Sequence, residues 1–304
     1  MHIVTRPDFD GVVCAALLRD ALRLPGPVVW LEPDEVGASP PRVRPGDVLA
    51  NLPWHPACSL WFDHHATHRV EPPPPGLFRL SPSAARNVFD YFAGRFSRDH
   101  AALVAWADRI DAAELSCEEI LHPERCLPLW VSLTVSAESP RREDYWDHLA
   151  RLLGEGGVAA AAEDPRVRAA CREVLAGMRA YEARLRACTR QVGPVAVSDF
   201  RPHPETPPGN RYLVYCLYPE ATASLRIRWA DEGRTHVTLH LGHSIVNRGC
   251  PVHAGRLLAR FGGGGHRGAA SVRLPAGRAE EAIAAVLAAL AGAGGAAASP
   301  AAGR

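Results

Sequence analysis

Two short stretches of the chain carry side chains that can bind a metal ion and a phosphate group. Asp63-His64-His65 directly follows an apolar run. Asp8 and Asp10 lie two residues apart, shortly after another apolar run. Carboxylate and imidazole groups together suit a divalent transition metal. A second histidine can carry a proton or donate a hydrogen bond to a phosphate. These residues therefore predict a metal-dependent site that acts on phosphate.

Each of these stretches also has a simpler interpretation. A helix N-cap explains one of Asp8 and Asp10 but leaves the other unexplained, because capping takes a single carboxylate. The histidines could lie in a solvated surface turn. Asp108 and Asp111 are three residues apart, a spacing that places both carboxylates on one helix face, where solvated helix-end charges are the alternative.

A third stretch, the glycine run Gly262–Gly265, is followed by His266 and Arg267. Four consecutive glycines carry a large entropic penalty, and a helix C-cap needs only one of them. Bare backbone N–H groups can approach phosphate oxygens closely, and the two cationic side chains add charge-assisted donors. A flexible linker is the alternative, but the run lies between a predicted helix and a predicted strand. We therefore predict a ligand-binding loop.

The elements around Asp8 predict how these residues are positioned. Pro7 ends a strand that begins at Ile3, and Gly11 allows a sharp turn into an apolar helix that reaches about Leu24. Strands that alternate with helices indicate a mostly parallel α/β sheet, which binds ligands at the carboxyl ends of its strands. The other strands expected in this region are 28–31, 47–51 and 58–62, and the other helices are about 81–96 and about 100–107.

The second half of the chain predicts a helical linker and a smaller C-terminal α/β domain. Apolar residues repeat at heptad spacing over 163–192, which indicates a bracing helix and leaves a coiled-coil homodimer as an alternative. The strands expected beyond it are 195–200, 212–217, 224–229, 236–241 and 270–274, and the helices are 252–261 and about 278–290. We expect a catalytic domain at 1–160, the linker helix at 161–192, a substrate-binding domain at 193–290 and a disordered tail at 291–304.

Composition excludes several classes of mechanism. The formal net charge of the 304 residues is +1, and all 34 basic residues are arginine, which excludes a P-loop lysine and a Schiff-base lysine. The eight cysteines are scattered without a C-x-x-C pair, and several of them, which lie in apolar stretches, are expected to be buried thiols. With no signal peptide and no apolar run that could span a membrane, the expected location is the cytoplasm.

The three motifs together resemble the DHH phosphoesterases with a DHH-associated C-terminal domain. Asp8-x-Asp10-Gly11, Asp63-His64-His65 and Gly262–Ala270 occur in the family's order over about residues 1–275. The family includes RecJ-type exonucleases, nanoRNases, cyclic-dinucleotide phosphodiesterases and exopolyphosphatase-like proteins. The resemblance implies hydrolysis of phosphodiester or phosphoanhydride bonds with Mn²⁺, as one or two ions, with Mg²⁺ or Co²⁺ as alternatives.

The resemblance also implies roles for individual residues. Asp63 would be a metal ligand or would hold an imidazole in place, His65 would contact the scissile phosphate, and Arg6 would assist catalysis. The other metal ligands implied are Asp8, Asp10, Asn51, His64 and Asp108. The substrate-binding residues implied are Arg226, Asn247, Gly263, Gly264, Gly265, His266 and Arg267.

Two positions depart from the family's pattern. Val4 stands where many members have a histidine, and Asn51 stands where the family usually has an aspartate that bridges two metals. Asn51-Leu52-Pro53 and Thr5-Arg6 favour the exopolyphosphatase-like branch, with polyphosphate as substrate. The alternatives are a nanoRNase or cyclic-dinucleotide phosphodiesterase, acting on short oligonucleotides or cyclic dinucleotides, and a degenerate protein that binds nucleotide or polyphosphate without hydrolysis.

Overall fold

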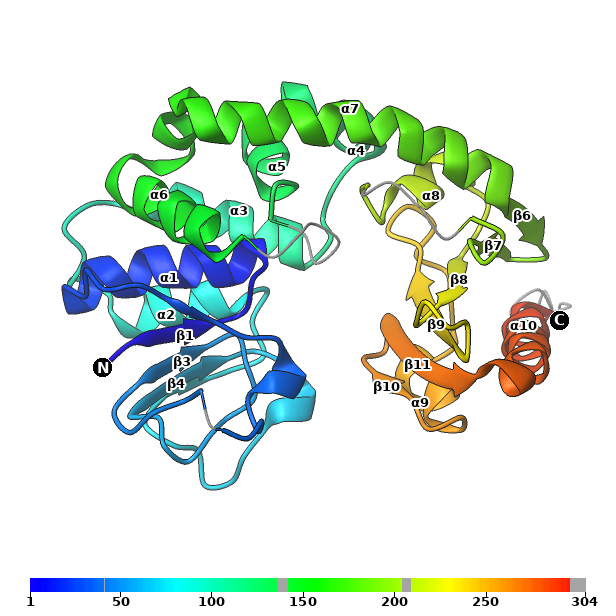
Figure 1. Cartoon of the computed structure of the whole chain (residues 1–304), viewed down its shortest axis with the longest axis horizontal. Coiled ribbons are helices and arrows are strands. Elements are labelled where there is room, and N and C mark those ends of the chain that lie inside the picture. The colour runs from blue at the N-terminus through cyan, green and yellow to red at the C-terminus, as the bar shows by residue number, and fades with distance from the viewer. Residues whose placement is uncertain (41, 136–141, 204–208, 296–304) are drawn as a thin grey trace, which may run out of the picture. The chain divides into compact units, whose positions relative to one another are not determined.

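The computed structural model describes residues 1–40, 42–135, 142–203 and 209–295, and Figure 1 shows their helices and strands. The chain forms two compact units. Unit 1 consists of Met1–Leu115 and His122–Leu175, and unit 2 consists of Ser116–Leu121 and Ala176–Arg304. The division into catalytic, linker and substrate-binding domains by function remains a prediction.

Unit 1 is built on a five-stranded parallel sheet. The order of the strands is β2-β1-β3-β4-β5, and every neighbouring pair is parallel. Parallel strands are buried on both faces, which explains their continuous apolar sequences. The sheet confirms the predicted α/β class with a mostly parallel N-terminal sheet. Its strands are β1 (Ile3–Thr5), β2 (Val29–Trp30), β3 (Val48–Ala50), β4 (Leu60–Asp63) and β5 (Gly76–Phe78).

Helices cover one face of this sheet, and irregular chain covers the other. Figure 1 shows α1 and α2 along the sheet, and α3 and α6 pack on α1. The helical face buries Leu17, Phe62 and Leu149, whereas the opposite face buries Leu49 and Trp61. The helices of unit 1 are α1 (Phe9–Leu22), α2 (Ala84–Tyr91), α3 (Ala101–Asp111), α5 (Leu127–Ser132) and α6 (Glu143–Glu163), with short 3-10 turns η1 (Pro33–Glu35), η2 (Ala66–His68) and η3 (Pro123–Arg125).

The long helix α7 (Pro165–Cys188) begins in unit 1 and ends in unit 2. It is shorter than predicted, because Thr189–Val192 form strand β6, which pairs with β7 across a turn. The apolar stripe of the helix is buried within the single chain; Tyr181, for example, is 2% exposed and stacks on Phe200. A stripe that packs inside its own chain does not serve as a coiled-coil seam.

Unit 2 contains a six-stranded mixed sheet in the order β10-β11-β9-β8-β7-β6, in which β7 and β8 are parallel and the other neighbouring pairs are antiparallel. One face packs on α9 and α10 and buries Leu225, Leu239 and Val272. The opposite face carries the alternate, polar residues of the same strands. The elements are β7 (Val195–Asp199), β8 (Ala223–Trp229), β9 (His236–His243), β10 (Gly264–Gly265), β11 (Ala269–Pro275), α4 (Cys117–Leu121), α8 (Leu213–Leu217), α9 (Ala254–Ala259), η4 (Ala276–Arg278) and α10 (Ala279–Gly295).

Several expectations about secondary structure were wrong. The strand expected at 212–217 is helix α8; the side chain of Asn210 accepts a hydrogen bond from the Tyr212 backbone N–H at its start (3.0 Å). A short apolar run has no periodicity that separates a strand from a helix. The tail expected to be disordered from 291 continues α10 to Gly295, and 296–304 lie outside the described residues. Helices α4, α5 and α6 were not predicted. Within the described residues, no helix combines the length and the apolar character needed to cross a membrane.

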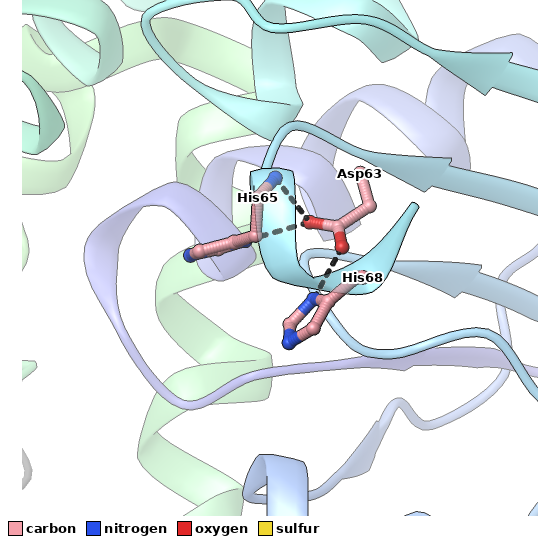
Figure 2. Close-up of side chains that lie close together, drawn as sticks. All are labelled: Asp63, His65 and His68. Atoms are coloured by element: carbon pink, nitrogen blue, oxygen red, sulfur yellow. Dashed lines mark hydrogen bonds and ion pairs between the residues drawn. The ribbon is translucent and has the colours of Figure 1, made fainter. Parts of the chain in front are cut away.

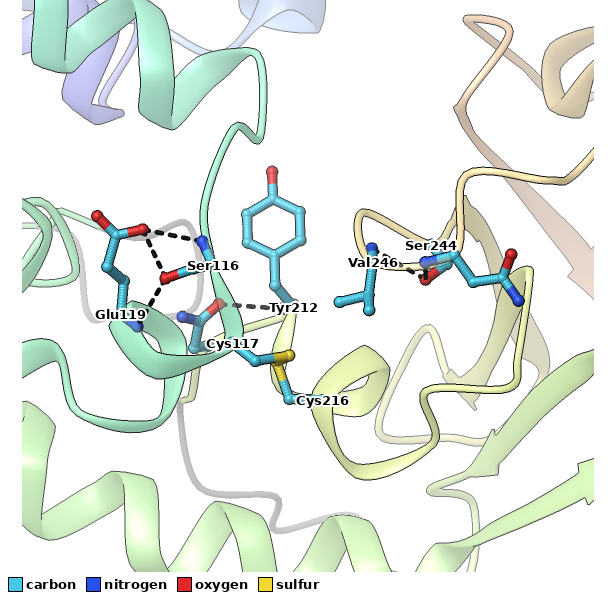
Figure 3. Close-up of a disulfide and its surroundings, with 9 residues drawn as sticks. Ser116, Cys117, Glu119, Tyr212, Cys216, Ser244 and Val246 are labelled. Carbon is cyan, nitrogen blue, oxygen red and sulfur yellow. Dashed lines mark hydrogen bonds between the residues drawn. A yellow bond between two sulfur atoms is a disulfide. The ribbon is translucent and has the colours of Figure 1, made fainter.

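Cys117 and Cys216 form a disulfide that joins α4 to α8 in unit 2, across a sequence separation of 99 (Figure 3). The expectation that cysteines in apolar stretches are thiols was therefore wrong for Cys216; spacing alone does not reveal two cysteines that the fold brings together. The start of α4 is fixed by a reciprocal capping box, in which the Glu119 carboxylate accepts from the Ser116 N–H (2.8 Å) and the Ser116 hydroxyl accepts from the Glu119 N–H (3.2 Å).

Removing this disulfide is expected to destabilise unit 2. The double variant Cys117→Ser/Cys216→Ser should lower the free energy of unfolding by about 2–4 kcal/mol, because the cross-link restricts the unfolded chain. Denaturant unfolding of the oxidised protein measures this, and Cys126→Ser, at a cysteine outside the disulfide, is the control. Thiol titration of the unfolded, oxidised wild type should count only the six free cysteines. A titration that finds all eight of the chain's cysteines as thiols would contradict the pairing.

Candidate metal and phosphate site

Asp10, His64 and Asp111 meet at the carboxyl edge of the unit 1 sheet. Asp10 lies in the first turn of α1, His64 directly follows β4, and Asp111 is the last residue of α3. The Nε2 atom of His64 lies 3.3 Å from Asp111 Oδ2 and 3.9 Å from Asp10 Oδ2. One ligand atom from each residue lies within 4.8 Å of the others. The structure thus brings two of the predicted ligands, Asp10 and His64, together with a third residue, Asp111.

Asp10 is held by the start of a neighbouring helix. Its carboxylate oxygens accept from the backbone N–H groups of Ala84 and Ala85, both at 2.8 Å, in the first turn of α2. Burial raises the pKa of Asp10 well above its ordinary value, and the charges of Asp111 and Asp8 raise it further. This crowding of carboxylates in a buried place is relieved when a cation binds among them.

His64 is oriented with one nitrogen toward the carboxylates. Its Nδ1 lies 3.0 Å from the backbone oxygen of Ser81. Because a carbonyl oxygen only accepts, Nδ1 carries the proton, and Nε2 presents a lone pair. This Nε2 is buried and has no hydrogen-bond partner among the described residues. A buried, unpartnered imidazole nitrogen between two carboxylates fits a divalent metal ion, and a second-sphere carbonyl that fixes the tautomer is usual for metal-binding histidines.

Asp63 lies at the centre of a second group, with His65 and His68 (Figure 2). Its Oδ1 is 2.7 Å from His65 Nδ1, and its Oδ2 is 2.5 Å from His68 Nδ1. Burial acts to raise the pKa of Asp63, but the hydrogen bonds from the two imidazoles outweigh it and lower the pKa. Both rings therefore turn their Nδ1 atoms toward one carboxylate and their Nε2 atoms away from it. His68 was not predicted, although its place three residues after His65 could have suggested it.

Asp108, which was expected to bind metal, has other partners. Its Oδ2 accepts from Arg86 Nη2 (2.6 Å) and Nε (2.9 Å), and its Oδ1 accepts from the Ser83 hydroxyl (2.6 Å). Ser83 is the N-cap of α2, so Asp108 fixes α3 to the helix end that holds Asp10. Asp111, one helical turn farther along, is the carboxylate that faces His64. The geometry therefore favours Asp111 over Asp108 as the ligand beside His64.

Asp8, Asn51 and Arg6 form a third group beside the first. Asp8 caps α1, and its Oδ1 accepts from the Gly11 N–H (2.8 Å) and from Asn51 Nδ2 (2.9 Å). Its Oδ2 lies 3.4 Å from Arg6 Nε, which also lies 3.3 Å from Glu32 Oε2. The capping alternative for Asp8 is therefore correct, and the amide of Asn51 and the guanidinium of Arg6 face its remaining lone pairs.

In unit 2 one row of residues crosses the polar face of the sheet. Arg226 pairs with His240, His240 with Ser271, and Ser271 with Gly264 in the strand register. Directly paired residues point to the same face, so Arg226 and Gly264 share a face at a separation of three strands, roughly 14 Å. Burial and the charges of Arg228 and Arg226 lower the pKa of His240 to about 4, so its ring is neutral at pH 7. The alternation of polar and apolar residues in β9 could have revealed His240.

The glycine run forms the edge strand β10 and its approaches. Gly263 and Gly265 have no room for a Cβ atom, which would lie 2.4 Å from the backbone oxygens of Ser271 and Ala269 respectively, and Gly262 and Gly265 have φ values of +86° and +144°. Gly264 differs, because a Cβ there would meet no atom of the described chain within 4 Å. The fold thus requires three of the four glycines, and the described chain gives no reason for the fourth, Gly264.

The other predicted substrate-binding residues surround this loop and the next. The exposed His266 and Arg267 are held through their backbone, because their carbonyl oxygens accept from Gly255 (2.8 Å) and Ala254 (2.9 Å) at the start of α9. The Asn247 side chain donates to the carbonyl oxygen of Glu220 (3.2 Å). Binding by these residues remains a prediction.

No protein-family model and no curated protein matches the chain. Among solved structures, the pGpG-specific phosphodiesterase PggH from Vibrio cholerae superposes with a TM-score of 0.78 at 22% identity, over 96% of this chain and 99% of that one. The DHH domain of a member of a family of ribosomal proteins gives 0.64 at 12% identity, covering 95% and 86%. Exonuclease RecJ bound to manganese gives 0.52 at 17%, covering 95% and 90%. The chain therefore has the fold of DHH-domain proteins, as the resemblance implied.

Proposed function

We propose that the chain is a DHH-type, metal-dependent phosphoesterase that hydrolyses a phosphodiester or phosphoanhydride bond. The observation that carries this proposal is the buried, unpartnered Nε2 of His64, which faces the carboxylates of Asp10 and Asp111. No hydrogen bond within the described parts of the chain uses this lone pair, and a divalent cation is the ligand that satisfies all three groups at once. Manganese and a cytoplasmic location belong to the same proposal.

We assign separate roles in metal binding and phosphate binding to the residues of unit 1. Asp10, His64 and Asp111 hold the cation, which when bound lowers the pKa of a water molecule and neutralises charge on the phosphoryl oxygens. Asp63 fixes the rings of His65 and His68 through their Nδ1 atoms, so that each Nε2 faces outward. We assign His65 to the scissile phosphate, with His68 beside it at a ring-centroid distance of 5.0 Å.

We assign substrate binding to the polar row of unit 2. Arg226 supplies a planar cation for a phosphate, and its guanidinium carbon lies 5.5 Å from the Phe200 ring. A row of roughly 14 Å between Arg226 and Gly264 suits a substrate with more than one phosphate or nucleoside group. The likeness to PggH over nearly the whole of both chains favours a short linear dinucleotide over polyphosphate as the first substrate to assay.

A hydrolysis assay tests the proposal. The purified full chain, freed of metal by a chelator and reloaded with Mn²⁺, Mg²⁺ or Co²⁺, is incubated with pGpG, short oligonucleotides, a cyclic dinucleotide and polyphosphate. We expect metal-dependent release of mononucleotide or phosphate from at least one of them, and renewed loss of activity with chelator. Tight binding without turnover by folded, metal-loaded protein would favour the degenerate binding protein instead.

Gly264 and Gly265 offer a matched pair of variants in the binding loop. Gly264→Ala adds a methyl group on the face that carries Arg226, where the described chain leaves space. We expect unchanged thermal stability and a KM raised by roughly tenfold, which corresponds to about 1.4 kcal/mol of binding free energy. Gly265→Ala would place an alanine at φ +144° and its Cβ 2.4 Å from the backbone oxygen of Ala269. This variant should therefore have a lower melting temperature.

Gly277→Ala is the control for these two variants, because a Cβ there also meets nothing in the described chain within 4 Å but lies outside the row. It should change neither KM nor stability. A wild-type KM in Gly264→Ala would contradict the assignment of the row to substrate binding.

A further inference from the structure

Among the buried side-chain atoms at the carboxyl edge of the unit 1 sheet that lack hydrogen-bond partners in the described residues, two are acceptors on side chains with no hydroxyl group. One is Nε2 of His64, and the other is Oδ1 of Asn51. Asn51 is 2% exposed and follows β3; its backbone N–H donates to Phe62 in β4 (2.9 Å). Its side-chain orientation is fixed, because Nδ2 donates to Asp8. An amide oxygen that is buried without a donor loses free energy unless a cation binds it.

Asp8 differs from Asp10 in the kind of donors around it: Asp10 accepts from two backbone N–H groups, whereas Asp8 also meets the side chains of Asn51 and Arg6. Its Oδ1 accepts from two N–H groups, of Gly11 and Asn51, and its Oδ2 faces the guanidinium of Arg6 at 3.4 Å. Within the described residues, Asp8 belongs to no group of three or more His, Cys, Asp or Glu side chains with ligand atoms in mutual reach. A cation at Asp8 would have to displace the Asn51 amide and compete with the positive charge of Arg6.

We infer that the metal centre is mononuclear. Asp10, His64, Asp111 and the amide oxygen of Asn51 hold one divalent cation. The contacts of Asp8 with Asn51 and Arg6 prevent a second cation from binding beside it. This inference deepens the proposed function and rests on it. The amide of Asn51 has two roles, since its oxygen binds the cation while its Nδ2 donates a hydrogen bond to Asp8. The guanidinium of Arg6 lies beside the Asp8 carboxylate and balances its negative charge, as a metal ion at this place would.

A single substitution inverts this arrangement. Asn51→Asp keeps an oxygen for the first cation but replaces the donor Nδ2 by a second carboxylate oxygen. Two carboxylate oxygens would then face each other across the present 2.9 Å between residue 51 and Asp8. Like charges at this separation in a buried site repel strongly unless a cation lies between them. The variant should therefore create a second metal site.

Metal counting tests the inference without an activity assay. The full chain is loaded with Mn²⁺, passed through a desalting column and analysed for manganese per chain by atomic emission, with electron paramagnetic resonance to detect coupled pairs. We expect one ion in the wild type, one or none in Asn51→Ala, and two, with a coupled spectrum, in Asn51→Asp. Without metal, Asn51→Asp should melt at a lower temperature than wild type and recover on addition of Mn²⁺.

The possible results separate the inference from the proposed function. Two ions in the wild type would overturn the mononuclear centre and leave the phosphoesterase intact. No bound metal in folded wild-type protein would overturn the proposed function itself. Asn51→Asp that folds and retains one ion would overturn the role of Asn51. If that variant does not fold, the wild-type count still decides between one ion and two.

Discussion

Replacing His64 by alanine is expected to abolish metal-dependent hydrolysis while the protein remains folded. The substitution removes the Nε2 atom that lies 3.3 Å from Asp111 and 3.9 Å from Asp10. It leaves two carboxylates without the neutral ligand between them, so the affinity for the cation falls along with turnover. If the cation contributes about 4 kcal/mol to stabilising the transition state, kcat/KM falls at least about 10³-fold.

The fold is expected to survive because the His64 side chain contributes little to it. Its Nδ1 bonds to the Ser81 carbonyl oxygen, and the loss of such a bond costs about 1 kcal/mol. His148→Ala is the matched control, because His148 Nε2 also faces a carboxylate oxygen, of Asp164, at 3.0 Å. Both variants should keep the circular dichroism of the wild type, and only His64→Ala should lose bound Mn²⁺ and activity. Retained wild-type activity in His64→Ala would refute the metal centre.

The position of the site could be predicted from the sequence, because the physics of parallel sheets is local. An apolar strand followed directly by polar residues places them at the carboxyl edge. The strands before Asp8 and Asn51, and the strand that ends in Asp63, all end there. The glycine run could also be recognised from the sequence as unusual. The backbone geometry requires three of its glycines but does not require the fourth, Gly264.

What could not be predicted depends on contacts between distant segments. Asp108 and Asp111 share one helix face, and only the packing of α3 beside α2 shows which one meets Arg86 and which one meets His64. The pairing of Cys117 with Cys216 likewise requires the arrangement of α4 and α8. The prediction of a strand at 212–217 was wrong because a short apolar run fits a buried strand and a buried helix equally well.

Asparagine substitutions at the two acidic residues of α3 should have opposite effects. Asp111→Asn removes one of the charges that raise the pKa of Asp10, so repulsion within the metal-free protein decreases. The metal-free variant should melt at or above the wild-type temperature, but it should lose most of its affinity for Mn²⁺, because the ligand charge opposite His64 is gone. We expect its kcat/KM to fall by about 10²-fold or more, equivalent to roughly 3 kcal/mol.

Asp108→Asn should do the reverse. It breaks the two-point contact with Arg86 at 2.6 and 2.9 Å, and leaves that guanidinium without this carboxylate beside α2. Hydrogen bonds to charged groups contribute about 1.5–3 kcal/mol each, so the melting temperature should fall clearly. Bound Mn²⁺ should stay at the wild-type level, since Asp108 does not face His64. Loss of the metal in Asp108→Asn, with retention in Asp111→Asn, would instead restore Asp108 as the ligand, as the family resemblance implied.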